Sequence, residues 1–209
     1  MFNFFFPSFP SIYLLGRILL HLLTGGLGKQ SKTTAAIMTT TSVRFLIISD
    51  THNHDCRGVT DKKHGFRSEA IKDIDVVLHC GDMTENGQLG DYEKVITMLG
   101  SIDAELRLVI AGNHDLTLDK DYVNSDAYLG RGGKFEDHEA AVNMLTGSLA
   151  TENGVHYLEE GVHSFTLTSG ATLTLYASPW TPKYGASAFQ YGASLTDTTR
   201  HRQIGLKML

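Results

Sequence analysis

The chain has few cysteines. Only Cys56 and Cys80 occur among its 209 residues, and two cysteines make no disulfide framework of the kind that holds small secreted domains together. Cys80 ends an apolar run, which is typical of a small buried side chain. The length is sufficient for one domain with its own hydrophobic core. We therefore predict a reducing, cytoplasmic location.

Acidic residues are missing from the first 49 positions. That segment carries four basic residues, Arg17, Lys29, Lys32 and Arg44. The remainder holds 14 basic and 23 acidic side chains, a net charge of −9. A body this acidic argues against a nucleic-acid partner, because such a surface needs clustered Lys and Arg. Concentrated carboxylates suit a cation site instead.

The start of the chain also lacks an uninterrupted apolar run of membrane-spanning length. Leucines and isoleucines between Ile12 and Leu23 recur at helical spacing, and glycines from Gly25 onward end the pattern. Arg17 interrupts this apolar run, which disfavours a transmembrane span. No charged side chain precedes Arg17, which disfavours a secretory signal.

Three interpretations of this N-terminal extension, residues 1–42, remain open. It is acid-free, basic and amphipathic, which fits a mitochondrial transit peptide and gives mitochondria as the alternative location. It is also compatible with a disordered segment outside the working protein, because a chain starting at Met38 would keep every motif below. Membrane contact through residues 1–28 is the third interpretation, and we do not favour it.

Polar motifs directly follow three apolar runs of strand length. Asp50-Thr51-His52 follows residues 43–49, Gly81-Asp82 follows residues 76–80, and Gly112-Asn113-His114-Asp115 follows residues 106–111. An amphipathic pattern over residues 89–99 predicts a helix between the second and third runs. Alternating strands and helices predict a parallel sheet with crossover helices. The motifs would then leave the carboxyl ends of strands, where ligands bind in open α/β sheets.

The pattern loosens after the third motif. Residues 136–146 predict a helix and residues 155–158 a short strand, and residues 164–176 predict an antiparallel hairpin. Trp180 lies between two prolines and is either a core residue or a wall of the substrate cleft, with the wall favoured. We predict a domain over residues 43–191 and a tail over residues 192–209.

The residue types in the three motifs suit divalent metals, which accept carboxylate, imidazole and amide oxygen together. Asp50 and His52 share a face of an extended segment, so both reach one ion. Asp82 can bridge two ions, and Asn113 offers a neutral oxygen to the second. Two ions about 3.5–4 Å apart can hold a phosphoryl oxygen and a nucleophile. His114 would then be the partner that is not a ligand, donating a hydrogen bond or a proton to the leaving oxygen.

A further acidic residue, Asp115, completes the third motif. It is placed to orient a neighbouring histidine through a hydrogen bond from outside the ligand set.

At these residues the chain resembles the calcineurin-like metallophosphoesterase superfamily. Its hallmarks, Asp-x-His, Gly-Asp and Gly-Asn-His-(Asp/Glu), are all present. Residues 111–119 and 177–182, with Phe189 nearby, look like the fetal-brain-type metallophosphodiesterase branch. The resemblance runs from about residue 44 to residue 191. It implies an αββα sandwich with a dinuclear centre of Mn²⁺, Fe²⁺ or Zn²⁺ between the strand ends.

The resemblance also implies a role for each motif residue. Asp50 and His52 would bind the first metal, Asp82 would bridge, Asn113 would bind the second metal, and His114 would assist the leaving group. The implied substrates are small phosphoesters: phosphodiesters, with cyclic nucleotides as one candidate, and phosphomonoesters.

The family's later metal-binding histidines are missing. No strand ending in histidine and no Gly-His-x-His segment follows Tyr176, and the only histidine beyond it is His201. The second metal would keep only Asp82 and Asn113, which predicts a weak second site and an incomplete second sheet. We therefore interpret the chain as a carboxy-terminally truncated metallophosphoesterase. The alternative function is a catalytically impaired member that binds metal or a partner without turnover.

Overall fold

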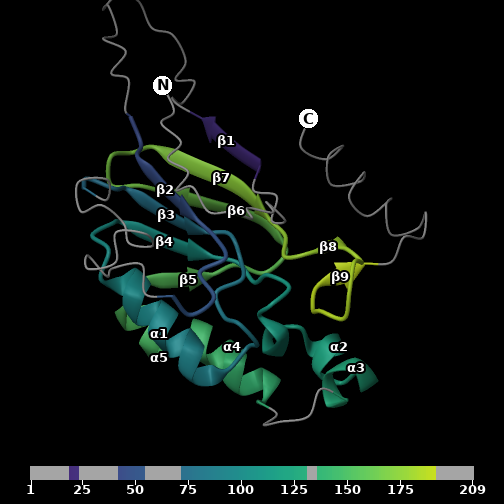
Figure 1. Ribbon diagram of the computed structural model, residues 1–209. Coiled ribbons are helices and arrows are strands. Elements are labelled where there is room, and N and C mark those ends of the chain that lie inside the picture. The colour runs from purple at the N-terminus through teal and green to yellow at the C-terminus, as the bar shows by residue number, and fades with distance from the viewer. Residues whose placement is uncertain (1–18, 24–41, 55–71, 131–135, 192–209) are drawn as a thin grey trace, which may run out of the picture.

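A four-stranded parallel sheet forms the centre of the fold (Figure 1). The computed structural model describes residues 19–23, 42–54, 72–130 and 136–191. The strands of this sheet lie in the order β2 (Phe45–Ile48), β3 (Val76–His79), β4 (Leu106–Val109) and β5 (Val155–Tyr157). The three apolar runs before the motifs are therefore strands β2, β3 and β4, as predicted, and they are parallel neighbours.

Helices cover one face of the parallel sheet. They are α1 (Leu89–Gly100), α4 (His138–Thr146) and α5 (Ser148–Glu152). Helix α1 buries Tyr92, Val95, Ile96 and Leu99, whose spacing of three to four residues places them on one side. The predicted α/β architecture is thus confirmed. None of the helices among the described residues is long and apolar enough to cross a membrane.

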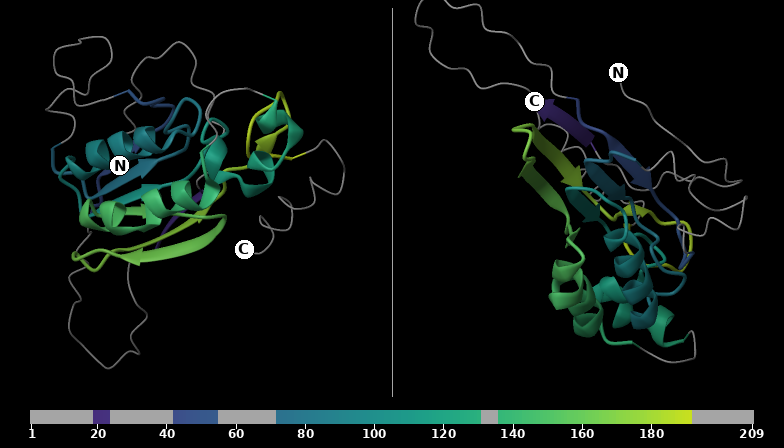
Figure 2. Two further views of the ribbon diagram at one scale, coloured as in Figure 1. Left: turned by 90° about the horizontal axis from the view of Figure 1, so that it is seen from below. Right: turned by 90° about the vertical axis from the view of Figure 1, so that its left-hand side faces the viewer.

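A second, antiparallel sheet packs on the other face. Its strands lie in the order β1 (Leu19–Leu23), β7 (Thr172–Ala177) and β6 (Gly161–Thr166), and Figure 2 shows the two sheets as successive layers next to the helices. An apolar layer joins the sheets, with Leu78 and Leu108 from the parallel sheet and Leu173 and Leu175 from the antiparallel one. The predicted hairpin corresponds to β6 and β7.

Short elements complete the fold at the carboxyl ends of the parallel strands. The third motif runs into a 3₁₀ turn, η1 (Leu116–Leu118), followed by α2 (Lys120–Val123) and α3 (Asp126–Leu129). Two two-residue strands, β8 (Thr181–Pro182) and β9 (Gln190–Tyr191), pair with each other beside α2 (Figure 1).

The helical interpretation of the N-terminal extension is wrong for Leu19–Leu23. These residues form β1, which pairs antiparallel with β7 from Leu19 opposite Tyr176 to Leu23 opposite Thr172. The physical reason is the edge of β7, whose backbone N–H and C=O groups gain hydrogen-bond partners from a neighbouring strand. The rest of residues 1–41 and the predicted tail, 192–209, lie outside the described residues.

A fully buried histidine lies on β3, one of the two inner strands of the parallel sheet. His79 is the last residue of β3, and its Nε2 is 2.9 Å from the hydroxyl oxygen of Thr51. Burial lowers the pKa of His79 from 6.5 to about 3, and positive charge on His52 adds to the effect. The unfolded chain binds this proton below pH 6.5 while the folded chain does not, so folding stability is lost as the pH falls from 6.5 towards 3.

Replacement of His79 with Gln tests this assignment. The variant keeps a polar partner for Thr51 and removes the titration, so the free energy of unfolding should fall less steeply between pH 6.5 and 3 than in the wild type. Urea unfolding at a series of pH values measures the slope. His156→Gln, at an exposed position in β5, is the matched control and should keep the wild-type slope. An unchanged slope in His79→Gln would refute the buried neutral histidine.

Candidate metal centre

The three motifs leave the same edge of the parallel sheet. Ile48 lies opposite His79 and His79 opposite Val109, so the strands end level with one another. The first motif then runs alongside the second: the N–H groups of Asp50 and His52 donate to the carbonyl oxygens of Gly81 and Asp82, at 3.0 and 3.1 Å. The sheet register thus places the polar residues of the motifs together.

Two glycines let the second and third motifs touch. A Cβ on Gly112 would collide with the backbone nitrogen and a carboxylate oxygen of Asp82. Gly81 has φ of +99°, and a Cβ there would lie 2.9 Å from the carbonyl oxygen of Ala111. The N–H of His114 donates to Oδ1 of Asp82 at 2.8 Å. The Asp82 carboxylate therefore rests directly on the backbone of the third motif.

Asp115 fastens the same two loops from inside the protein. Its Oδ1 accepts from the N–H and the hydroxyl of Thr84, both at 2.9 Å, and its Oδ2 accepts from the N–H groups of Gly112 and Met83, at 2.8 and 3.2 Å. Burial raises the pKa of Asp115 to about 7, against these donors, which favour the ionised form. The expectation that Asp115 orients a histidine is wrong, because these loop donors occupy both of its oxygens.

Three side chains converge above this junction. One ligand atom each from His52, Asp82 and His114 lies within 4.8 Å of the others. The two imidazole rings are 4.6 Å apart between centroids and nearly perpendicular, at 86°. Burial raises the pKa of Asp82, and the charge of Asp50 acts in the same direction. A carboxylate and an imidazole are ligands that a divalent transition metal accepts, and the second imidazole is near enough to serve as a ligand or as a proton donor. A cation would offset the cost of the buried charge on Asp82.

Glu85 contacts both histidines of this group. Its Oε2 is 3.3 Å from Nδ1 of His52, and its backbone carbonyl oxygen is 2.9 Å from Nδ1 of His114. A carbonyl only accepts, so Nδ1 of His114 carries a proton and Nε2 is the ring nitrogen available to the centre. Glu85 lies outside the motifs that indicated the other residues of this group. Its spacing of three residues from Asp82, on the same loop, is the signal that could have indicated it.

The other two predicted ligands lie beside this group. The hydroxyl of Ser49 donates to Oδ2 of Asp50 at 2.5 Å, and the charge of Asp50 helps to raise the pKa of Cys80 to about 12, after burial as the larger cause. Asn113 is 4% exposed, and its backbone carbonyl oxygen accepts a hydrogen bond from the N–H of Ala188 at 3.2 Å. The structure therefore brings His52, Asp82 and His114 together and places Asp50 and Asn113 on the same loops.

Left-handed backbone conformations concentrate at the centre. Of six non-glycine residues with positive φ among the described residues, Asp50, His52, Asn53 and Asp82 belong to or adjoin the first two motifs. Asp, Asn and His adopt this conformation more readily than most residues. Such a cluster is typical of functional sites, where the surrounding structure maintains local strain.

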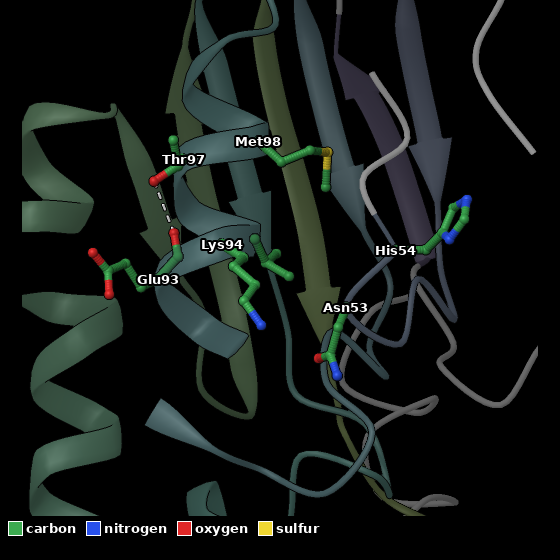
Figure 3. A pocket seen from close by; sticks show the side chains of 7 residues that line it. Asn53, His54, Glu93, Lys94, Thr97 and Met98 are labelled. Atoms are coloured by element: carbon green, nitrogen blue, oxygen red, sulfur yellow. Dashed lines mark hydrogen bonds between the residues drawn. The ribbon is translucent and has the colours of Figure 1, made fainter. Parts of the chain in front are cut away.

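A cavity of about 300 Å³ adjoins the first motif. Figure 3 shows Asn53 and His54, which follow the motif, across from the labelled side chains of α1, with the His54 ring directed away from that helix. The lining residues are Asn53, His54, Glu93, Lys94, Val95, Thr97 and Met98. Lys94 is paired with Asp91 at 2.9 Å. The cavity thus offers space for a small group next to the loop that carries His52.

We expect Asp115→Asn to destabilise the fold. The side-chain NH₂ of Asn would replace one carboxylate oxygen. It would then face either the N–H groups of Gly112 and Met83 or the N–H and hydroxyl of Thr84, so two donors would lose their acceptor. Thermal and urea unfolding should show a loss of about 2–4 kcal/mol. Asp103→Asn, at an exposed position, should change stability by less than about 0.5 kcal/mol. Equal stabilities of the two variants would contradict the role assigned to Asp115.

Comparison with known proteins shows the family to which the three motifs belong. The family model described as calcineurin-like phosphoesterase matches residues 43–185. Human and mouse proteins named metallophosphoesterase domain-containing protein 1 are each 30% identical to this chain over 148 residues, which is 66% of this chain and 38% of theirs. A protein of Emericella nidulans named probable rhamnogalacturonate lyase C is 33% identical over 162 residues, 78% of this chain and 12% of that protein.

The chain therefore spans well under half the length of these relatives. The family match nevertheless covers more than half of the chain and includes all three motifs. This chain belongs to the calcineurin-like phosphoesterase family, as its motifs predicted.

Proposed function

We propose that this chain is a metal-dependent phosphoesterase that hydrolyses phosphodiesters or phosphomonoesters. The observation that carries the proposal is the convergence of His52, Asp82 and His114 within 4.8 Å at strand ends that are level with one another. In a member of this family, such a convergence supports a metal centre that acts on phosphate esters.

The centre is proposed to hold two ions, with Mn²⁺, Fe²⁺ and Zn²⁺ as candidates. Asp50 and His52 would bind the first ion, Asp82 would bridge, and Asn113 would bind the second. Bound divalent ions supply polarisation of a phosphoryl oxygen and activation of water. The second site is the weaker in this proposal, because Asp82 and Asn113 are its only assigned ligands.

His114 is proposed to protonate the leaving oxygen. Its Nδ1–H is held by the carbonyl oxygen of Glu85 at 2.9 Å, which leaves Nε2 as the ring nitrogen that can act at the centre. A proton held at Nε2 is then available to the departing alkoxide or phenolate. The carboxylate of Glu85 lies 3.3 Å from Nδ1 of His52, within ion-pair distance of that ring when it is protonated.

Two finer features follow from family membership as proposals. The complete fold would be an αββα sandwich, of which the described residues supply two sheets and one helical layer. The substrate would be a small phosphoester, with cyclic nucleotides among the candidates. Its organic group would use the cavity of about 300 Å³ beside Asn53 and His54, which is at the lower end of the size range of ligand pockets.

Metal binding and turnover together test this function. The wild type should bind Mn²⁺ in calorimetry and hydrolyse bis-p-nitrophenyl phosphate, and Asp82→Asn should weaken metal binding and abolish turnover. Asp121→Asn, at an exposed site, is the control for a general loss of one negative charge. Metal binding without turnover in the wild type would instead support a catalytically impaired family member. Absence of both would refute a metal centre.

The proposed acid role of His114 predicts a dependence on the leaving group. His114→Gln should lose about 100-fold in kcat for an alkyl phosphoester, whose leaving oxygen needs a proton, and less than about tenfold for a p-nitrophenyl ester. Mn²⁺ affinity should stay near the wild-type value. A matching loss of Mn²⁺ affinity would show that His114 is a metal ligand instead.

A further inference from the structure

The segment that joins β8 to β9 is fastened to the third motif. The N–H of Ala188 donates to the backbone carbonyl oxygen of Asn113 at 3.2 Å, and the N–H of Phe189 donates to a carboxylate oxygen of Asp119 at 2.7 Å. The hydroxyl of Tyr122 donates to the carbonyl oxygen of Ala186 at 3.0 Å. These three bonds fix residues 186–189 against the loop and turn that follow β4.

The same segment is also held together internally. The N–H groups of Thr181 and Lys183 donate to the carbonyl oxygens of Phe189 and Tyr191, at 2.9 and 3.0 Å. The rings of Trp180 and Phe189 meet edge to face at 5.7 Å, and Trp180 packs against the main core. Trp180 thus supports this segment from the core side, and residues 183–186 form its exposed tip.

Tyr184 lies at that tip, on the segment that is bonded to the backbone of Asn113. Its side chain is 58% exposed, although most large apolar side chains among the described residues are covered. Burial and the charges of Asp82 and Asp50 raise the pKa of Tyr184, and a hydrogen bond between its hydroxyl and the side chain of Asn113 lowers it. A phenol on a well-supported segment therefore lies beside Asn113, a predicted ligand of the second metal.

We propose that Tyr184 contacts the substrate, with its hydroxyl donating a hydrogen bond to a phosphoryl oxygen of the bound phosphoester. This inference rests on the proposed function. A phosphoester held at the centre would present its phosphoryl oxygens next to Asp82 and Asn113, within reach of this hydroxyl. The Tyr184 hydroxyl can donate one hydrogen bond. A charged phosphoryl oxygen is a stronger acceptor for it than the side-chain amide of Asn113. Tyr184, rather than Trp180, would then form the polar wall of the cleft.

Tyr184→Phe removes the hydroxyl and keeps the ring. Tyr176→Phe, which removes a hydroxyl bonded to Glu160 on the antiparallel sheet, is the matched control. With Mn²⁺-loaded full-length protein, calorimetry with inorganic phosphate should show about tenfold weaker binding in Tyr184→Phe, as expected for a lost hydrogen bond to a charged group. The value of kcat/KM should fall by a similar factor for phosphodiester and phosphomonoester p-nitrophenyl substrates, while the control stays at the wild-type values.

Mn²⁺ affinity, measured before phosphate is added, separates this role from a structural one. It should be the same in Tyr184→Phe and wild type, because the hydroxyl acts on the substrate. A parallel loss of Mn²⁺ affinity would show that Tyr184 only positions Asn113, and phosphate binding at the wild-type level would show that the hydroxyl donates nothing. Either result overturns this inference while leaving an active wild-type enzyme. A wild type that neither binds phosphate nor hydrolyses esters overturns the proposed function as well.

Discussion

The close contact between the loops that follow β3 and β4 is the constraint on which the candidate centre depends. Asp82 can rest on the backbone of the third motif only because residue 112 has no Cβ. The buried carboxylate of Asp115 then ties both loops through donors from Met83, Thr84 and Gly112. The position of His114 follows, since its N–H is bonded to the same Asp82 carboxylate.

The junction of these two loops also carries several acidic side chains. Asp50, Asp82 and Asp115 bring negative charge into a partly buried region, and burial raises the pKa of both Asp82 and Asp115. A bound cation would stabilise the ionised carboxylates. The fold thus concentrates acidic groups where solvent stabilises them poorly, an arrangement that could hold a metal ion. The acidic composition of residues 50–209 agrees with that preference.

The parts of the fold that the sequence predicted are those in which local pattern and position coincide. Continuous apolar runs gave β2, β3 and β4, and the spacing of Tyr92, Val95, Ile96 and Leu99 gave α1. The motifs indicated their own grouping, because parallel strands end at one edge. The pairing of β1 with β7 was not predictable in this way, because it depends on an edge formed by residues about 150 positions away.

The sequence motifs contain the three side chains that the structure brings together, His52, Asp82 and His114, but they do not indicate the contacts that support them. Glu85 and Tyr184 carry no motif, and their relation to the centre arises only once loops from separate parts of the chain come together. Asp115 was identified as polar and adjacent, yet its partners are backbone groups, which a sequence pattern does not reveal. Residue types thus indicated a metal site. Only the tertiary contacts show which groups hold the site residues in position.

Anomalous diffraction from crystals of the Mn²⁺-loaded protein would show directly whether the residues at the three strand ends bind a metal ion. The account predicts a manganese peak bonded to His52 and Asp82, with Asp50 completing its ligands and Nε2 of His114 on the same side. A manganese peak elsewhere, or no peak at this group under saturating Mn²⁺, would contradict the assignment of the three strand ends as a metal centre.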